Sequence, residues 1–409
     1  MNQESAPPEA RSSLARLPGG IWALGTVSMF MDISSEMIHG LLPVFLTSVM
    51  GASTEMIGLI EGIGEATASI SKLFSGWLSD RLGKRKTLAV IGYGLGALSK
   101  PLFALAPTPS LVLAARFSDR VGKGIRGAPR DAMVGDMVPA GLRGAAYGLR
   151  QALDTVGAFA GPLIAIALMA MLHDNFRLIF WLALIPGVIS VLVLLIAVRE
   201  PPHDEAAAQA PLKFGGLKTL PTSYWIVVGI SAVLTLARFS EAFLILRAQG
   251  LGLSLALAPL VLVVMNIVYS LSAYPLGALS DKVDRKAMLA GGFVILIVAD
   301  VILATAPNLP VVMAGVALWG LHMGMTQGLL AASVADVAPS ILRATSFGVF
   351  NFVSGIALLL ASLVAGVLWE IFGPYATFMA GAALTAVGLA ATMLVLREAP
   401  RRGAGPALR

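Results

Sequence analysis

The chain contains no cysteine, which excludes disulfides, thiolate-bound metals and cysteine nucleophiles. It also lacks a Gly-x-Ser-x-Gly nucleophile motif, a His-Glu-x-x-His zinc motif and a phosphate-binding Gly-x-x-x-x-Gly-Lys loop. These absences argue against a hydrolase, a zinc peptidase and direct use of ATP. We therefore expect no enzymatic activity, no resident metal and no cofactor.

Charged residues are also scarce, at 13% of the chain, whereas 57% of its residues are apolar. A soluble protein carries about a quarter charged residues. Apolar runs close to the ~20 residues that cross a hydrocarbon core follow one another from Ile21 to Leu396. The first 20 residues are polar and do not resemble a cleaved signal. The composition therefore predicts a multi-pass protein of the lipid bilayer.

We expect an all-α fold of twelve membrane-spanning helices. Most of the 29 lysines and arginines fall in loops on one side of this arrangement, which the positive-inside rule assigns to the cytoplasm. Both termini are then cytoplasmic, and a bacterial cytoplasmic (inner) membrane is the expected location. The helices are predicted at residues 20–48, 54–79, 87–106, 109–137, 144–172, 176–198, 221–249, 254–279, 287–306, 309–337, 345–372 and 374–397.

The two halves of the chain repeat each other. Gly76-Trp-Leu-Ser-Asp80-Arg81 recurs as Gly277-Ala-Leu-Ser-Asp281-Lys282, and the segment Asp136–Arg143 recurs as Asp336–Arg343 at nearly the same offset. Two six-helix bundles related by pseudo-symmetry follow, with a substrate site near the midplane between them. The predicted parts are a tail (1–19), a first bundle (20–198), a linker (199–220), a second bundle (221–397) and a second tail (398–409).

The segment Gly76–Lys86 resembles the signature loop between helices 2 and 3 of the major facilitator superfamily (MFS) of secondary transporters. The segments Met31–Met37 and Asp119–Arg126 resemble one prokaryotic branch of that superfamily with poorly defined substrates. The resemblance implies a conformational gate at Gly76, Asp80, Arg81 and Gly83. Asp136, a carboxylate within reach of Arg81, and Asp281, in the second copy, complete the predicted gate.

The predicted helix 109–137 carries charges that are expensive in a bilayer. Each costs roughly 2.5–3.5 kcal/mol near the middle of a spanning helix, so the helix is expected to turn them inward. The corresponding positions of the second half are uncharged, from Val316 to Ala331, so the fold itself does not require them. The charged residues are Arg116, Asp119, Arg120, Lys123, Arg126, Arg130 and Asp131.

Two readings of this charged stripe are open. It forms a path for substrate and protons, or its residues pair among themselves and with Asp154, with those near the cytoplasm extending to the membrane surface. Arg126 to Asp131 stay divided between these two readings.

The first predicted helix supplies acidic counterparts, because Asp32, Glu36 and His39 lie on one helical face. Removal from water favours the protonated form of a carboxylate, whereas a nearby arginine favours the ionised form. We therefore predict that Asp32 and Glu36 face Arg116 and Arg120 as a proton-coupling unit. The alternative is a purely structural network of buried salt bridges. Helix 221–249 keeps part of the pattern in Arg238 and Glu241.

Helix 144–172 contains Gly157, Gly161 and Pro162, a pattern similar to the glycine-proline motif of proton antiporters in that superfamily. Glycines four residues apart allow two helices to approach closely, and proline bends a helix. This pattern favours export.

The sequence thus predicts a proton-coupled exporter of a small anionic or zwitterionic organic molecule, acting by alternating access. The alternatives are an exporter of divalent metal ions or metal chelates, because Asp, Glu and His at helical spacing accept such cations, and a membrane-embedded enzyme or sensor. Expected partners are the small-molecule substrate, protons and the lipid bilayer. A monomer is expected, and no nucleic acid is expected as a partner.

Overall fold

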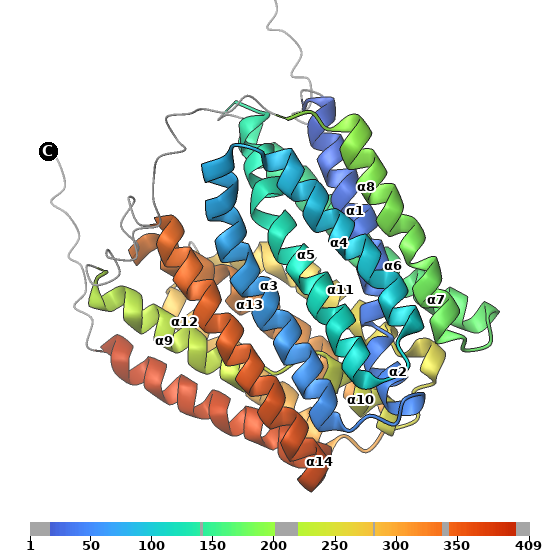
Figure 1. The fold of residues 1–409 in the computed structure, drawn as a ribbon. Helices are drawn as coiled ribbons and strands as arrows, with labels where there is room; N and C mark the ends of the chain where they lie inside the picture. The colour runs from blue at the N-terminus through green and yellow to red at the C-terminus, as the bar shows by residue number, and fades with distance from the viewer. Residues whose placement is uncertain (1–16, 140–141, 201–219, 281–282, 338–342, 398–409) are drawn as a thin grey trace, which may run out of the picture.

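The computed structural model describes residues 17–139, 142–200, 220–280, 283–337 and 343–397, which fold into helices joined by short turns (Figure 1). The first half contains α1 (Gly19–His39), α2 (Leu42–Ser48), α3 (Thr54–Leu82), α4 (Arg85–Leu105), α5 (Pro109–Asp136), α6 (Arg143–Met171), α7 (Phe176–Leu182) and α8 (Leu184–Ala197). The second half contains α9 (Thr222–Ala237), α10 (Ala242–Gly250), the short 3-10 helix η5 (Leu255–Leu257), α11 (Leu260–Ser280), α12 (Arg285–Thr305), α13 (Leu309–Val337) and α14 (Arg343–Arg397).

Each of the twelve predicted segments has a counterpart, but several are interrupted. The first segment breaks between α1 and α2, and the seventh breaks between α9 and α10. The last two segments are the arms of α14, which bends at Gly373, where φ is 79°. Only glycine adopts that φ without strain, and Pro374 directly after it cannot continue the hydrogen bonds of the first arm.

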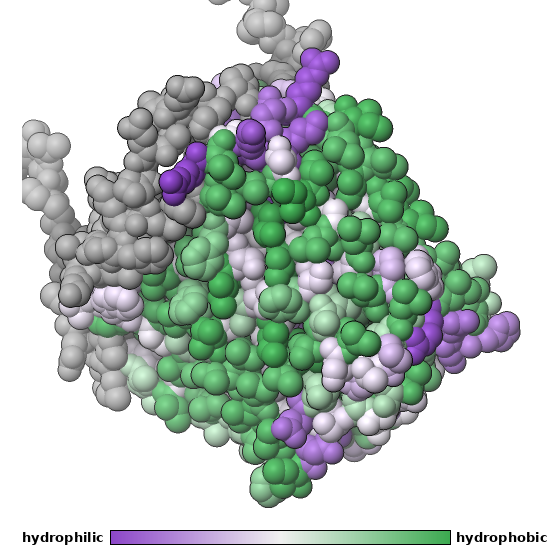
Figure 2. All heavy atoms as spheres, in the orientation of Figure 1, coloured by the Kyte–Doolittle hydropathy of each residue, from purple (hydrophilic) through white to green (hydrophobic). Residues whose placement is uncertain are grey.

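By length and composition, nine stretches of the described chain qualify as membrane spans. One of them covers both arms of α14, whereas α3 and α5, which carry charges along their lengths, are outside the set. The helices are therefore consistent with twelve crossings. Hydrophobic side chains cover the broad middle of the surface, and hydrophilic ones gather toward its ends (Figure 2). This belt is what a bilayer requires of a multi-pass protein.

The repeat predicted from the sequence is visible in helix bounds. α4 and α12 begin 200 residues apart at Arg85 and Arg285, and α5 and α13 begin at Pro109 and Leu309. The predicted linker and the two predicted tails lie almost entirely outside the described residues.

The two halves meet along α3 and α14, which lie side by side (Figure 1). Glycines allow this contact: a Cβ atom on Gly58 would lie 2.2 Å from the carbonyl oxygen of Ser362, and one on Gly62 would lie 3.0 Å from that of Leu359. Only hydrogen atoms fit there, so the backbones touch directly.

We name the end of the bundle that holds the α3–α4 turn, with Lys84 and Arg85, the basic face, and the other end the opposite face. Polar contacts join the halves at the opposite face. The Glu370 carboxylate accepts hydrogen bonds from the Thr54 backbone N–H (2.9 Å) and hydroxyl (2.7 Å). Gln249 donates to the Ser48 hydroxyl at 2.9 Å. The molecule is therefore closed at the opposite face.

Because the backbones touch at Gly58, Gly58→Val should prevent closure of the opposite face. The chain has no cysteine, so a single Leu262→Cys reporter, at a side chain that is only 1% exposed in the closed form, can be alkylated selectively. We expect labelling by a membrane-impermeant maleimide to be several-fold faster with Gly58→Val. Gly94→Val is the matched control, because nothing lies within 4 Å of a Cβ at Gly94. Equal labelling of both variants would contradict the closure contact.

Candidate functional site

The charged helix α5 packs closely against two neighbours through glycine. A Cβ on Gly122 would lie 2.7 Å from the Gly92 carbonyl oxygen of α4, and one on Gly124 would lie 2.3 Å from Cβ of Ser71 in α3. These contacts bring the backbones together and fix the rotation of α5. Its charged side chains consequently point toward α1, α3, α4 and α6 inside the first half.

The charges of α5 nearest the opposite face are buried and paired. Arg116 donates to Glu61 of α3 at 2.6 Å, and Arg120 lies 3.4 Å from Glu65 of the same helix. The sequence-based prediction placed Asp32 and Glu36 opposite these arginines; the structure gives both arginines carboxylate partners on α3 instead. The physical reason is that α3, not α1, packs against this face of α5.

Asp119 belongs to a third buried pair on the α4 side. Lys100 donates to its carboxylate at 2.8 Å and to the Ser35 hydroxyl at 3.1 Å. The Ser99 hydroxyl adds a hydrogen bond of 3.3 Å to the same carboxylate. Burying one charge without its partner costs several kcal/mol, so these pairs stabilise the bundle only as complete units.

A second cluster lies nearer the basic face. Arg130 contacts Asp131 at 3.0 Å and Asp154 at 3.9 Å, and it donates to the Ser28 hydroxyl at 3.0 Å. Arg150 of α6 lies 2.7 Å from Asp154 and 3.6 Å from Asp131. Four charged groups therefore share one network between α5 and α6.

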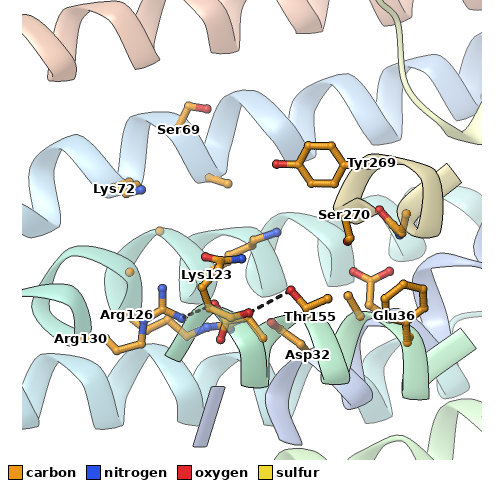
Figure 3. A pocket seen from close by; sticks show the side chains of 18 of the residues that line it. Asp32, Glu36, Ser69, Lys72, Lys123, Arg126, Arg130, Thr155, Tyr269 and Ser270 are labelled. Carbon is orange, nitrogen blue, oxygen red and sulfur yellow. Dashed lines mark hydrogen bonds and ion pairs between the residues drawn. The ribbon is translucent and has the colours of Figure 1, made fainter. Parts of the chain in front are cut away.

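Between these paired groups lies a cavity of about 450 Å³, shown in Figure 3. Lys123, Arg126 and Asp32 line it, and none of the three has an ion-pair or hydrogen-bond partner among the described side chains. Arg126 lies over the ring of Tyr93, 5.0 Å from its centroid, and Lys123 is exposed to the cavity. Lys72, Arg130, Asp154 and Glu36 complete its charged lining.

A second cavity of about 310 Å³ adjoins the first and extends between the halves. Glu36 and Lys123 line both cavities. His39 lies 3.4 Å from Glu36 and 3.8 Å from Glu61, which links α1 to the Arg116 pair. Arg238 and Glu241, in the break between α9 and α10, face this second cavity from the other half.

The predicted gate residues lie at the basic face. Gly83 ends α3 with φ of 64°, the left-handed conformation that glycine adopts readily. Gly76 faces Ala128 of α5: a Cβ atom on Gly76 would lie 3.4 Å from the Cβ atom of Ala128. Arg81 lies in the last turn of α3. Asp136 forms an ion pair with Arg85. Asp281 and the side chain of Asp80 lie outside the described residues.

The glycines of α6 lie where this helix meets α1. A Cβ on Gly157 would lie 2.6 Å from the Met29 carbonyl oxygen, and one on Gly161 would lie 2.7 Å from Cβ of Glu36. Pro162 lies inside the same helix. The contact holds Asp32 and Glu36 in place at the cavity wall.

The site predicted from the sequence left out four charged partners: Glu61, Glu65, Lys100 and Arg150. The i, i+4 spacing of Arg150 and Asp154 was an available signal for one of them. No cluster of three His, Asp or Glu side chains with metal-binding geometry occurs among the described residues.

Two helical halves with charged cavities between them, inside an apolar belt, are the arrangement of membrane transporters that bind a solute at the interface between repeats. The family model of the Major Facilitator Superfamily matches residues 24–264 and 226–409. The chain belongs to this superfamily, whose members are secondary transporters.

Relatives support this assignment. The chain is 35% identical over 379 residues to an uncharacterized MFS-type transporter of Methanocaldococcus jannaschii, covering 91% of this chain and 93% of that protein. It is 26% identical to a gentisate transporter of Corynebacterium glutamicum, covering 91% of this chain and 86% of that protein. The crystal structure of a bacterial homologue of the lysosomal transporter Spinster, in an inward-facing and occupied conformation, has the same fold. Its TM-score is 0.76 at 17% identity, covering 92% of this chain and 96% of that one.

The buried Arg116–Glu61 pair gives a stability prediction. Glu61→Gln leaves Arg116 without its counterion in a site where it is only 2% exposed, so the free energy of unfolding should fall by about 3–5 kcal/mol. Replacing both partners by Arg116→Met and Glu61→Gln should recover much of that loss. The measurement is denaturant unfolding in detergent micelles. Glu55→Gln, at an exposed position of the same helix, is the control, and an equal loss in that variant would argue against the pair.

Proposed function

We propose that this transporter is a proton-coupled exporter of a small anionic or zwitterionic organic molecule. The observation that carries the proposal is a set of four charges at one cavity, Lys72, Lys123, Arg126 and Asp32, that have no ion-pair or hydrogen-bond partner among the described side chains, while Arg116, Arg120 and Asp119 nearby are paired. A bound cargo would supply the missing counterions. The proposed orientation places the basic face in the cytoplasm, so the larger cavity loads from the cytoplasm.

The two cations would hold the anionic group of the cargo. Arg126 offers a planar guanidinium already oriented by the Tyr93 ring, whereas Lys123 is a mobile point charge at the junction of the two cavities. An anionic group between them would replace cavity water with charge-assisted hydrogen bonds, which are about twice as strong as neutral ones.

Asp32 would carry the proton, and the chemistry of the cargo decides the direction of coupling. The ammonium group of a zwitterion competes with the proton for the Asp32 carboxylate, so cargo and proton bind in alternation, which is exchange. A purely anionic cargo competes instead with the carboxylate for Lys123 and Arg126, which favours protonation and hence co-transport. Export driven by proton entry therefore favours the zwitterion.

Alternating access requires contacts that exist in one state and break in the other. The Glu370–Thr54 and Gln249–Ser48 hydrogen bonds would be such contacts at the opposite face, where they are formed in the present state. At the basic face the predicted gate residues would make the corresponding contacts after the halves rock, whereas the Arg85–Asp136 ion pair is already formed inside the first half.

One comparison and the lining of the cavity bear on the cargo. One relative is named for gentisate, a small organic anion, which agrees with a cationic binding site. The metal-exporter alternative has no such support, because the described residues hold no metal-binding cluster and cations dominate the cavity near Lys123. The relatives and structural neighbours are transporters, which leaves the enzyme or sensor alternative without support as well.

The cargo can be found by comparing the metabolites of cells that contain the protein with those of cells that lack it. A compound retained in the deficient cells is then tested for flux in proteoliposomes under an imposed pH gradient. The proposal fails if no retained compound moves in response to that gradient.

A substitution at Lys123 distinguishes a role in cargo binding from a role in folding. Lys123→Gln removes a cation that forms no ion pair or hydrogen bond with a described side chain, so folding should be unaffected. Loss of one charged hydrogen bond to cargo, about 1.5–3 kcal/mol, should raise the cargo Kd roughly ten- to a hundredfold. Lys123→Arg keeps the charge and should retain most binding. Unchanged cargo affinity in Lys123→Gln, measured by calorimetry on the purified protein, would remove Lys123 from the site.

A further inference from the structure

Asp300 of α12 is a carboxyl group that the transport site does not use. It is fully buried, and neither of its oxygens has a hydrogen-bond partner among the described residues. An ionised carboxylate in such a position is strongly unfavourable, whereas a protonated one is neutral and can donate a hydrogen bond.

The broken helix of the second half lies next to this carboxyl group. Residues 238–241 are not helical, so the Ala237 carbonyl oxygen at the end of α9 receives no backbone hydrogen bond from the described residues. A Cβ on Gly381 of α14 would lie 2.8 Å from Oδ2 of Asp300 and 3.2 Å from this carbonyl oxygen. Oδ2 of Asp300 and the Ala237 carbonyl oxygen therefore both lie close to Gly381. A carbonyl oxygen only accepts hydrogen bonds, so it can stabilise the protonated form of Asp300 and not the ionised form.

The internal repeat gives an independent argument that this position carries a function. Asp300 occupies the position of Lys100 in the first half, 200 residues earlier. Lys100 is satisfied there by Asp119 and by Ser35 of α1. In the second half the counterpart of Asp119 is Trp319, so Asp300 faces no counterion there. In addition, the first helix of that half is unwound beside Asp300, at residues 238–241. One half thus has an ion pair where the other has a lone acid.

The titratable groups described on the helices around Asp300 have other partners or line the second cavity. α13 contributes His322, whose Nδ1 lies 2.8 Å from the Gly292 carbonyl oxygen. The α9–α10 break contributes Arg238 and Glu241, which line the second cavity, and α14 contributes Glu370, which binds Thr54. No described side chain among these forms an ion pair with Asp300.

Gly381 also lines a small apolar crevice of about 60 Å³. It is lined by Phe239 of the break and by both arms of α14, including Leu360 and Leu384, which are 48% and 41% exposed on the surface. Gly381 therefore borders both the crevice and the carboxyl group of Asp300.

We propose that Asp300 is a second proton-binding site, which holds a proton while residues 238–241 pack against it and releases the proton when this segment moves. Movement of the break would carry Arg238 and Glu241 with it, and both line the second cavity. Asp300 would thereby couple its proton to the occupancy of that cavity. Proton binding stands on the geometry of Asp300 alone; the coupling to cargo rests on the proposed function.

The first test uses the wild-type protein and an apolar carbodiimide. A protonated carboxyl group adds across the carbodiimide C=N bond, and the adduct rearranges to a stable N-acylurea that mass spectrometry locates on a peptide. We expect dicyclohexylcarbodiimide to label Asp300 in membranes and a water-soluble carbodiimide to leave it unlabelled. Absence of the apolar label at Asp300, with label at other sites proving an active reagent, would overturn the proposal.

The second test uses Asp300→Asn, which keeps the shape and a donor but cannot release a proton. In proteoliposomes, flux driven by a pH gradient should fall to the rate of protein-free vesicles, while exchange of internal for external cargo continues. Thr385→Val is the control, because it removes another buried polar group of the same half, one that bonds the Gly381 carbonyl oxygen at 2.8 Å. Gradient-driven flux at the wild-type rate in Asp300→Asn would overturn the coupling. If the wild type itself shows no such flux, the proposed function fails, while the labelling still decides whether Asp300 binds a proton.

Discussion

A charge inside a bilayer must have a counterion, a polar partner or water, and the architecture of this chain follows from that requirement. Three of the charges on α5 meet it through direct partners on α3 and α4. Arg130 meets it through a network shared with α6. Lys123 and Arg126 meet it only through the cavity and an aromatic ring, and this incomplete compensation is what makes them available to a ligand.

Close packing makes the pairing possible. α5 can place its side chains against two neighbours only because Gly122 and Gly124 bring the backbones within van der Waals contact. The same device joins α6 to α1 at Gly157 and α3 to α14 at Gly58. Because the first two contacts lie inside one half and the third lies between halves, each half can stay rigid while the contact between them opens. That division is what alternating access needs.

Hydropathy and the internal repeat were sufficient to predict the helices, since apolar length and loop charge depend on composition alone. They could not show the breaks at residues 238–241 or at Gly40, because an unwound turn inside an apolar run leaves the run unchanged. The sequence also identified α5 and α1 as the charged helices. It could not pair Arg116 with Glu61, since the partner depends on the rotation of α3, which packing fixes and periodicity does not. Lys100 had been placed inside a predicted helix without an assigned face, and Arg150 had been counted among the basic residues on the cytoplasmic side.

The central claim is that Asp32 exchanges its proton against cargo bound at Lys123 and Arg126. The most direct measurement is proton movement during cargo flux, recorded with a pH-sensitive dye inside proteoliposomes that contain the wild type or Asp32→Asn. We predict that a zwitterionic cargo leaving wild-type vesicles down its own gradient draws protons in. In Asp32→Asn the cargo should still exchange across the membrane, with fewer protons moved per cargo molecule than in the wild type. Proton movement in Asp32→Asn at the wild-type ratio to cargo would contradict the claim.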